Sequence, residues 1–342
     1  MGQQDGGNRR QVLMNFQILV LGTILAGAAP GFAAGDDLLG LAQKVREFST
    51  IDRWQVSADV SQVVTNPEGP PLKVEGWFDS RGFKASDYHL KLKRSGPVED
   101  YFEELQHDGK SVSYQYELNG DKMENVVAGI SSEPVRLDNF KDISGYRFNI
   151  AGWVSPEGMS FDEFLAASLA IQNAAETGKG AIIENGRPRM EVSKTESDGE
   201  TSINVTSTAM ANEDEIQSVY SWTWEKDSGM AGLLKKESLT TTIRKKSSGE
   251  LVSSSRVILE AQEFETLAAG GTKVKWPVAF TRVVEMNGEM KMKSEVRLKN
   301  LKLGSTDWNR STTAEDIIPP DTDVVDKING LTYKSAKEDR SK

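Results

Sequence analysis

The stretch VAFTRVVEMNGEMKMKSEVRLK (residues 278–299) alternates between apolar and polar residues, with most even-numbered positions apolar and most later odd-numbered positions charged. Side chains of a β-strand point alternately to its two faces, so this pattern predicts a hairpin with one dry face and one wet face. An odd-length loop keeps all the even-numbered residues on one face. We therefore expect a three-residue turn around Asn287-Gly288, with Gly288 left-handed and a β-bulge. The hairpin predicts an antiparallel sheet and no particular chemistry.

Two earlier segments predict further hairpins of the same kind. In residues 72–92 the apolar set is even-numbered, which predicts an odd loop around Ser80-Arg81-Gly82. In residues 101–118 the apolar set changes from odd to even numbers, which predicts a two-residue turn at Asp108-Gly109. In each case the expected loop length keeps the apolar residues on one face of the sheet.

The first 33 residues have the order of a secretory signal peptide. Arg9 and Arg10 precede an apolar run over residues 14–29, and small residues follow as far as Ala33, where we expect cleavage. The run is short and interrupted for a membrane span, which needs about 20 apolar residues, although an uncleaved anchor is the alternative. Arg9-Arg10 also resembles a twin-arginine signal, so the export route is left open. We predict a periplasmic or secreted bacterial protein with no integral membrane span after cleavage.

Charge and cysteine content narrow the choice of compartment and partner. The chain has a net charge of −10 and no cysteine. Removing Arg9, Arg10 and Asp5 with the signal peptide takes away a net +1, leaving −11. This charge argues against nucleic acid or an anionic membrane as the main partner. An exported chain without disulfides depends on its core, and roughly 300 residues can bury enough surface for one large domain or two closely joined halves.

The remaining patterns predict mainly strands. An amphipathic helix is expected over residues 36–48, and a second helix begins at Ser160 with a capping box to Glu163 and ends near Thr177-Gly178. Strands are expected in two groups, residues 54–150 and 181–303, with residues 119–158 mostly irregular apart from a strand near 146–150. An extended tail over 304–333 and disorder over 334–342 complete the prediction. We therefore predict an α+β fold, a single domain over 34–333 in which both helices cover a strongly curved antiparallel sheet.

Aromatic and methionine residues of the expected dry faces are the candidate binding residues. Methionine adapts to irregular apolar ligands, and tyrosine combines an apolar body with a polar tip. The candidates are Phe78, Tyr88, Tyr101, Tyr114, Tyr116, Phe280, Met286, Met290 and Met292, with Trp222 or Trp224 as a further aromatic. The alternative is that these side chains only pack the core beneath the helices.

Glu103 is the one carboxylate that we single out as a candidate binding residue. It shares parity with Tyr101 and Leu105, and in the expected register it projects beside Tyr114. Two interpretations are open. Glu103 either anchors the headgroup of a ligand or lies near an open sheet edge, since an unpaired buried carboxylate is costly.

Catalytic and metal chemistry find little support. The chain has two histidines and no cysteine, which excludes a histidine-rich or thiolate metal site. We expect His89 on a solvated face and His107 as a polar residue flanking a turn. The adjacent acids Glu103 and Glu104 are expected on opposite faces of a strand, and Glu104, like the acidic groups other than Glu103, is expected to be a solvated surface charge. No nucleophile elbow, phosphate loop or dinucleotide fingerprint occurs, so we predict no catalytic residue, no metal and no cofactor.

The order of elements over residues 36–303 resembles the outer-membrane lipoprotein-sorting and carrier family (LolA/LolB/RseB-like). Members of this family have a signal peptide, an N-terminal helix, a half-open antiparallel β-barrel and helices that act as a lid. The closing segment, Val324-Val325-Asp326 and then Gly330-Leu331-Thr332-Tyr333, is similar to the end of secreted proteins from planctomycete-type bacteria. The resemblance implies a periplasmic location and binding of acyl chains in the concave face, without assigning functional residues.

Three functional hypotheses follow. The first is a non-enzymatic periplasmic protein that binds a hydrophobic ligand, namely an acyl chain, a lipid or a lipoprotein. The second is a structural or interaction module of the cell envelope, whose wet face or edge strand meets a protein partner. The third, a secreted hydrolase with a carboxylate pair, is retained because a fold does not determine a function.

Overall fold

The computed structural model describes most of the chain after residue 53. The described residues are 54–84, 87–96, 100–107, 110–119, 122–132, 143–145, 148, 159, 161–176, 188–197, 199–225, 234–269, 272–305 and 317–335. The predicted signal peptide and the helix expected at 36–48 lie outside these ranges. Of the strand expected near 146–150, only Phe148 is described, and its ring packs against Phe280 with 5.3 Å between the centroids.

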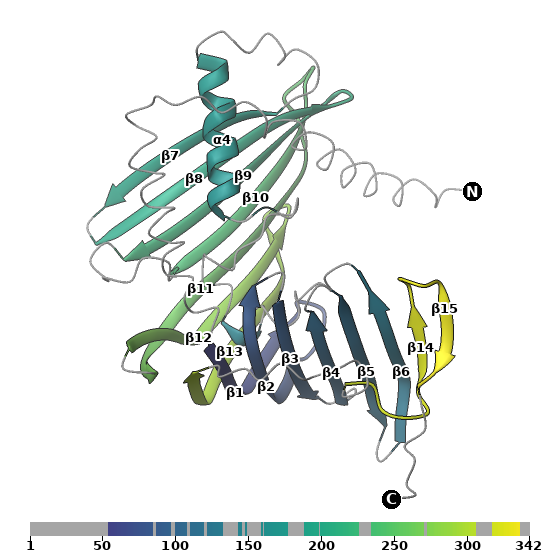
Figure 1. The fold of residues 1–342 in the computed structure, drawn as a ribbon. Helices are drawn as coiled ribbons and strands as arrows, with labels where there is room; N and C mark the ends of the chain where they lie inside the picture. The colour runs from purple at the N-terminus through teal and green to yellow at the C-terminus, as the bar shows by residue number, and fades with distance from the viewer. Residues whose placement is uncertain are drawn as a thin grey trace, which may run out of the picture. The chain divides into compact units, whose positions relative to one another are not determined.

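The described residues form mainly strands in one large open sheet with a single helix, α4 (Phe161–Glu176) (Figure 1). The strands are β1 (Trp54–Thr65), β2 (Leu72–Lys84), β3 (Asp87–Ser95), β4 (Asp100–His107), β5 (Ser111–Asn119), β6 (Lys122–Ser131), β7 (Arg189–Ser197), β8 (Glu200–Ala211), β9 (Asp214–Glu225), β10 (Lys236–Lys245), β11 (Leu251–Ala269), β12 (Thr272–Met286), β13 (Glu289–Ser305), β14 (Asp323–Asp326) and β15 (Leu331–Lys334). Their order is β15-β14-β6-β5-β4-β3-β2-β1-β13-β12-β11-β10-β9-β8-β7. The predicted α+β class with an antiparallel sheet and a mid-chain helix is confirmed.

The chain divides into two compact units, and each is assembled from separate stretches of sequence. Unit 1 comprises Met1–Phe48, Asn149–Leu259 and Val284–Met290. Unit 2 comprises Ser49–Phe148, Glu260–Val283 and Lys291–Lys342. The strands β11, β12 and β13 contribute residues to both units. The predicted single domain over 34–333 stays a prediction.

In unit 1, α4 packs on the sheet through aromatic side chains. The Phe161 ring meets the Trp222 ring edge-on with 5.0 Å between centroids, and Phe164 meets Tyr220 at 5.2 Å. The side-chain oxygen of Gln172 accepts a hydrogen bond of 2.7 Å from the backbone N–H of Val192, which joins the helix to β7. In the first turns of the helix, Phe161, Phe164 and Leu165 are almost fully buried.

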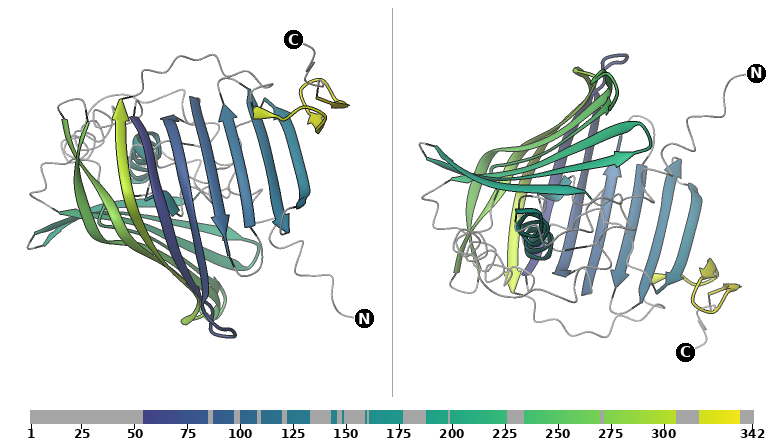
Figure 2. Two further views of the ribbon diagram at one scale, coloured as in Figure 1. Left: turned by 90° about the horizontal axis from the view of Figure 1, so that it is seen from below. Right: turned by 90° about the horizontal axis from the view of Figure 1, so that it is seen from above.

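In unit 2, strands β1 to β6 lie side by side, with the short hairpin β14–β15 beyond β6 (Figure 2). Residues that pair directly across neighbouring strands have side chains on the same face, so the pairing assigns residues to the two faces of this sheet. One, the aliphatic face, carries Val56, Ala58, Phe78, Leu90, Leu92 and Leu105. The other, the ion-pair face, carries His89, Lys91 and Glu104 on β3 and β4, and Val112 and Tyr114 on β5.

The prediction of a three-residue turn at Asn287-Gly288 is wrong. Strand β12 ends at Met286 and β13 begins at Glu289, so the loop has two residues, and φ is 52° at Asn287 and 79° at Gly288. Two left-handed residues are typical of a type I′ turn, which matches the twist of a hairpin. The left-handed Gly288 is confirmed. A two-residue loop places Met286 and Met290 on opposite faces near the turn, and both are exposed, at 44% and 38%. The predicted dry face therefore does not extend to this tip.

The two-residue turn expected at Asp108-Gly109 is also wrong. His107 pairs with Ser111, so three residues separate β4 from β5 and parity is preserved. Tyr101 and Leu105 therefore lie on the aliphatic face, whereas Val112 and Tyr114 lie on the ion-pair face. The change of parity in the sequence arises because both faces are covered here: Leu105 is buried on one side, and Ile317 and Ile318 cover Val112 and Tyr114 on the other.

The prediction that the even-numbered residues of 72–92 share one face is confirmed, but the structural feature that keeps them there is not the predicted odd-length loop. Phe78 pairs with Leu92 and Ser80 with Leu90, so the even-numbered residues share a face. The strand continues past the expected loop to Lys84, and a register shift between Arg81 and Lys84 preserves the parity. An irregularity within a strand can therefore have the same effect as an odd-length loop.

Two elements differ from the predicted boundaries. Strand β6 lies within residues 119–158, which were predicted to be mostly irregular. The alternation of its side chains is interrupted at Asn125, where φ is 49°, and so the strand was not predicted. At the other end, Lys334 is the last residue of β15 and Ser335 hydrogen-bonds to Thr322, so the predicted disorder is wrong at these two residues. The docked tail is confirmed over residues 317–333, and residues 336–342 lie outside the described ranges.

Candidate functional site

The predicted binding residues do not form one site. Phe78, Tyr101 and Glu103 share the aliphatic face of unit 2, whereas Tyr114 and Tyr116 lie on the ion-pair face, where their rings are 5.6 Å apart. The expectation that Glu103 projects beside Tyr114 is therefore wrong, and the odd-length β4–β5 loop is the reason. Glu103 instead pairs with Leu92 and Gln115.

The other predicted residues are distributed elsewhere. Phe280 is almost fully buried against Phe148 in unit 2, Met292 is half-buried, and the side chain of Tyr88 lies outside the described part of the chain. Met286 and Met290 belong to unit 1 and are exposed. Trp222 packs beneath α4, so its observed contacts are those of a core residue.

The aliphatic face changes from apolar to polar along one row of directly paired residues. This row runs from Phe78 through Leu92 to Glu103, Gln115 and Val127. Phe78 and Leu92 are buried, Gln115 is half-buried and Val127 is 48% exposed. The face therefore becomes accessible toward β6, and Glu103 marks the border between its apolar and polar parts.

Glu103 is a buried carboxyl group with polar neighbours. It is 8% exposed, and β4 lies between β3 and β5, so the interpretation of Glu103 as a residue at an open sheet edge is wrong. Burial raises the pKa of Glu103, while a hydrogen bond from Tyr101 and the charge of Arg94 oppose the shift. The hydroxyl of Tyr101 also lies 3.3 Å from Oε1 of Gln115. Tyr101 has one proton for these two acceptors, Glu103 and Gln115.

Arg94 completes this polar group. Its guanidinium carbon lies 5.3 Å from the centroid of the Tyr101 ring, within the range of a cation–π contact. Burial raises the pKa of Tyr101, and the neighbouring Glu103 carboxylate adds to the shift. Tyr101 therefore keeps its proton at neutral pH. The group of Arg94, Tyr101, Glu103 and Gln115 presents donors and acceptors at the end of an apolar surface.

The ion-pair face holds a second polar group that the sequence reasoning missed. Nε2 of His89 lies 2.8 Å from Oε1 of Glu104, and Nζ of Lys91 lies 3.0 Å from the same oxygen. His89 and Glu104 are 8% and 7% exposed, so the predictions of a solvated His89 and a solvated Glu104 are wrong. The predicted opposite orientation of Glu103 and Glu104 is confirmed. Only the register of β3 against β4, which pairs Lys91 with Glu104, could have indicated this cluster.

His107 occupies the position expected for a polar residue beside a turn. It ends β4, and its Nδ1 lies 2.9 Å from the hydroxyl of Ser111, with which it pairs across the loop. Its side chain is buried rather than solvated. The contact with Ser111 accounts for a histidine at this position without a catalytic role.

The two adjacent glutamates are expected to affect stability with opposite dependence on pH. The raised folded pKa of Glu103 means that wild-type stability falls as pH rises from the unfolded pKa, about 4.3, through the folded value. Burial alone would raise the pKa of Glu104, but hydrogen bonds from His89 and Lys91 outweigh it and hold this pKa below its ordinary value. The stabilisation from Glu104 is therefore present above the unfolded pKa and lost as pH falls through the folded pKa.

Urea denaturation of Glu103→Gln and Glu104→Gln between pH 3 and pH 7 tests this prediction. The stability of Glu103→Gln relative to wild type should increase as pH rises. Glu104→Gln should be less stable at pH 7 by about 1–3 kcal/mol, the usual worth of hydrogen bonds to a charged group, and should approach wild type in acid. If the stability of both variants relative to wild type changed with pH in the same direction, the opposite pKa shifts of Glu103 and Glu104 would be contradicted.

Two further observations concern only the described residues. They contain no group of three or more histidine, aspartate or glutamate side chains placed to hold a metal ion. None of their helices is long and apolar enough to cross a membrane.

Comparison with known proteins gives a distant structural likeness. No family model and no curated protein matches the sequence. The model is similar to a domain from Vibrio parahaemolyticus assigned to outer membrane lipoprotein sorting, with 11% identity, coverage of 82% of this chain and 95% of the other, and a TM-score of 0.37. It is also similar to a DUF1329 family protein from Desulfovibrio piger, with 12% identity, coverage of 82% of this chain and 96% of the other, and a TM-score of 0.38. A LolA superfamily protein from Nitrosomonas europaea has 9% identity, with coverage of 76% of this chain and 92% of the other, and a TM-score of 0.34.

TM-scores below 0.4 and identities near 10% do not decide the function of this chain. The functional argument therefore depends on its own residues.

Proposed function

We propose that this chain is a non-enzymatic, exported binding protein for a hydrophobic ligand, namely an acyl chain, a lipid or a lipoprotein. The ligand lies on the accessible end of the aliphatic face of unit 2, with its apolar part toward Val127 and its polar group near Glu103 and Gln115. The observation that carries the proposal is the row from Phe78 to Val127, which passes from buried apolar residues through a polar group to an exposed end. An apolar surface with a few convergent polar groups is typical of small-molecule sites.

The chemistry of the polar group suits the headgroup of such a ligand. Gln115 both donates and accepts hydrogen bonds, and Arg94 adds further donors and a positive charge. An ester or amide carbonyl can accept a hydrogen bond from the amide N–H of Gln115 or from the guanidinium of Arg94. The predicted signal peptide, residues 1–33, supports an extracytoplasmic location for this binding.

Native mass spectrometry of residues 34–342, purified from a bacterial periplasm without detergent, tests the proposal. We expect an adduct of lipid mass that solvent extraction removes. A clean mass that is unchanged after incubation with phospholipid vesicles would contradict ligand binding and favour the interaction module.

A second measurement locates the site with a fluorescent fatty acid as the probe. Glu103→Ala should weaken probe binding about tenfold, equivalent to about 1.4 kcal/mol, because a buried hydrogen-bonding partner is lost. Lys93→Ala is the matched control, since Lys93 precedes Arg94 on β3 and therefore points to the ion-pair face. Equal weakening by both variants would exclude the aliphatic face as the site.

The interaction module remains the second candidate, and one observation favours it. Seven of the large hydrophobic residues exposed within the described ranges lie on β6, β14, β15 or the turn between β14 and β15. They are Met123, Val126, Val127, Val325, Ile328, Leu331 and Tyr333. Concentrated exposed apolar surface often marks a protein contact.

A further inference from the structure

A second row of directly paired residues lies beside the polar group of the proposed site, on the same aliphatic face. It runs from β3 to β6 through Arg94, Tyr101, Glu117 and Glu124, and we call it the charged row. Arg94 and Glu117 are partly exposed and Glu124 is exposed, so the row is accessible at the same end of the face as Val127. The row has one positive charge on β3 and two negative charges on β5 and β6.

A bulge in β6 brings Glu124 onto this face. Gln115 pairs with Val127, but Glu117 pairs with Glu124, so β6 has one extra residue between the two pairs. In an uninterrupted register Asn125 would pair with Glu117, and Glu124 would point to the ion-pair face. Like charges directly opposite each other destabilise a sheet, and bulges often redirect side chains at functional sites. The paired carboxylates therefore do not serve the stability of the sheet.

Amide groups, rather than cations, hold the two carboxylates in place. The side-chain amide of Asn125 donates a hydrogen bond to Glu117, and that of Asn119 donates to Glu124 at 3.4 Å. Among the residues that the structure describes, no lysine or arginine forms an ion pair with either carboxylate. At the other end of the row, the guanidinium of Arg94 lies over the Tyr101 ring. Both ends therefore keep a charge with which a ligand can pair.

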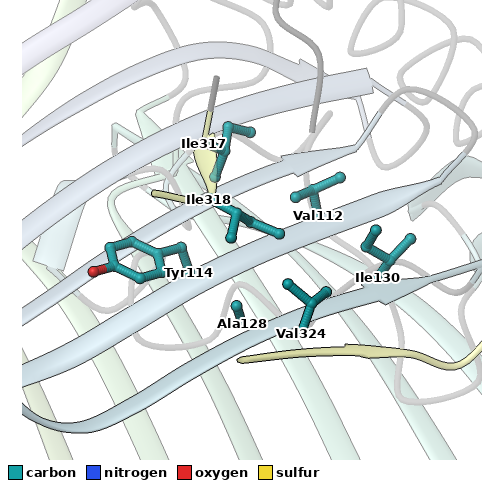
Figure 3. Close-up of a cluster of buried hydrophobic side chains, with 7 residues drawn as sticks. All are labelled: Val112, Tyr114, Ala128, Ile130, Ile317, Ile318 and Val324. Carbon is teal, nitrogen blue, oxygen red and sulfur yellow. The ribbon is translucent and has the colours of Figure 1, made fainter. Parts of the chain in front are cut away.

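The opposite side of β5 and β6 is already occupied by the chain itself. On the ion-pair face, the C-terminal segment contributes three residues to a buried apolar cluster with four residues of these strands. The cluster consists of Ile317, Ile318 and Val324 with Val112, Tyr114, Ala128 and Ile130 (Figure 3). A ligand that contacts these strands near Gln115 therefore has the aliphatic face available to it.

We infer that the ligand of the aliphatic face is a phospholipid with a zwitterionic headgroup, whose phosphate pairs with Arg94 and whose ammonium group pairs with Glu117 and Glu124. This inference rests on the proposed function of that face and specifies the class of its ligand. Arginine forms directional hydrogen bonds with phosphate oxygens, and an ammonium group donates to carboxylates.

The spacing of the strands suits a headgroup that carries both charges. Strands β3 and β5 are two strand spacings apart, about 10 Å. The flexible side chains of Arg94 and Glu117 can reach toward each other, so one compact headgroup can contact both. A lipid with a phosphate but no ammonium group would bring a like charge toward Glu117 and Glu124, which weakens binding.

Two lysophospholipids with the same acyl chain test the inference, one with an ethanolamine headgroup and one with a glycerol headgroup. Each is titrated calorimetrically, below its micelle concentration, into residues 34–342 purified from a bacterial periplasm. We expect the ethanolamine lipid to bind about threefold more tightly, the effect of one partly exposed ion pair, and this preference to decline as salt is added. Equal binding of the two lipids overturns the inference and leaves the proposed function standing. Binding of neither lipid overturns both.

Substitutions in the charged row connect the preference to its residues. Glu117→Gln removes the charge but keeps an acceptor for Asn125, and we expect it to abolish most of the preference for the ethanolamine lipid. Arg94→Gln should weaken both lipids by a similar factor, because both carry the phosphate. Asp100→Asn is the matched control, since Asp100 precedes Tyr101 on β4 and points to the ion-pair face. If the control lowers the preference as much as Glu117→Gln does, the charged row is not the headgroup site.

Discussion

Replacing Phe280 with aspartate is expected to lower the free energy of unfolding by more than about 4 kcal/mol, enough to unfold a marginally stable domain. Phe280 is 1% exposed, and its ring packs edge-on against Phe148. The substitution removes a large apolar side chain, which alone costs about 3–5 kcal/mol, and introduces a carboxylate where it is shielded from water. Urea denaturation followed by circular dichroism measures the effect.

Met290→Asp is the matched control for this substitution. In the sequence both residues belong to the same even-numbered apolar set of the β12–β13 hairpin. Met290 is 38% exposed near the turn, so we expect a change within about 0.5 kcal/mol. Similar losses for the two variants would show that the hairpin tip is covered in solution.

Trp222→Ala is expected to cost about 3–5 kcal/mol of unfolding free energy, the usual range for removing a buried tryptophan. Trp222 is fully buried, and its ring contacts Phe161 and Phe164 of α4 and stacks on Tyr220. The indole therefore contacts two aromatic residues of the helix. Loss of helix protection in hydrogen exchange should accompany the loss of stability.

Ser221→Ala provides the control for Trp222→Ala. Ser221 is the neighbouring residue on β9 and points to the opposite face of the sheet, where it is partly exposed. We expect a change of less than about 0.5 kcal/mol. A loss below 1 kcal/mol for Trp222→Ala would instead indicate that α4 is held mainly by other contacts.

Periodicity in the sequence located most strands, because burial of one face imposes a period of two wherever a strand has one dry side. This is why the predicted strand groups begin with β1 at residue 54 and contain β7 to β12, and why the helix expected from Ser160 to near Thr177 lies close to the observed bounds of α4. Strand β6 was missed because Asn125, with its left-handed backbone, interrupts the alternation that prediction depends on.

The candidate site was predictable only in part. Tyr101 and Glu103 were selected because they share parity with Leu105, and the structure does place them on one face of β4. The prediction that Glu103 projects beside Tyr114 was wrong, because it depended on the length of the β4–β5 loop. The ion pair of Glu104 with His89 and Lys91 joins residues of two strands, so it is defined by register rather than by pattern.

The sequence by itself determined that this chain forms an antiparallel sheet with a mid-chain helix, because strand and helix periods are local properties of side-chain order. Only the tertiary structure decided which apolar residues are buried. Phe280 and Met290 have the same parity but differ in burial, because the two-residue turn reverses parity between β12 and β13 and because Phe148 packs against Phe280. The tertiary structure likewise decided the opposite directions in which the pKa values of Glu103 and Glu104 are shifted, because a pKa depends on the partners and the water around a carboxylate rather than on its place in the chain.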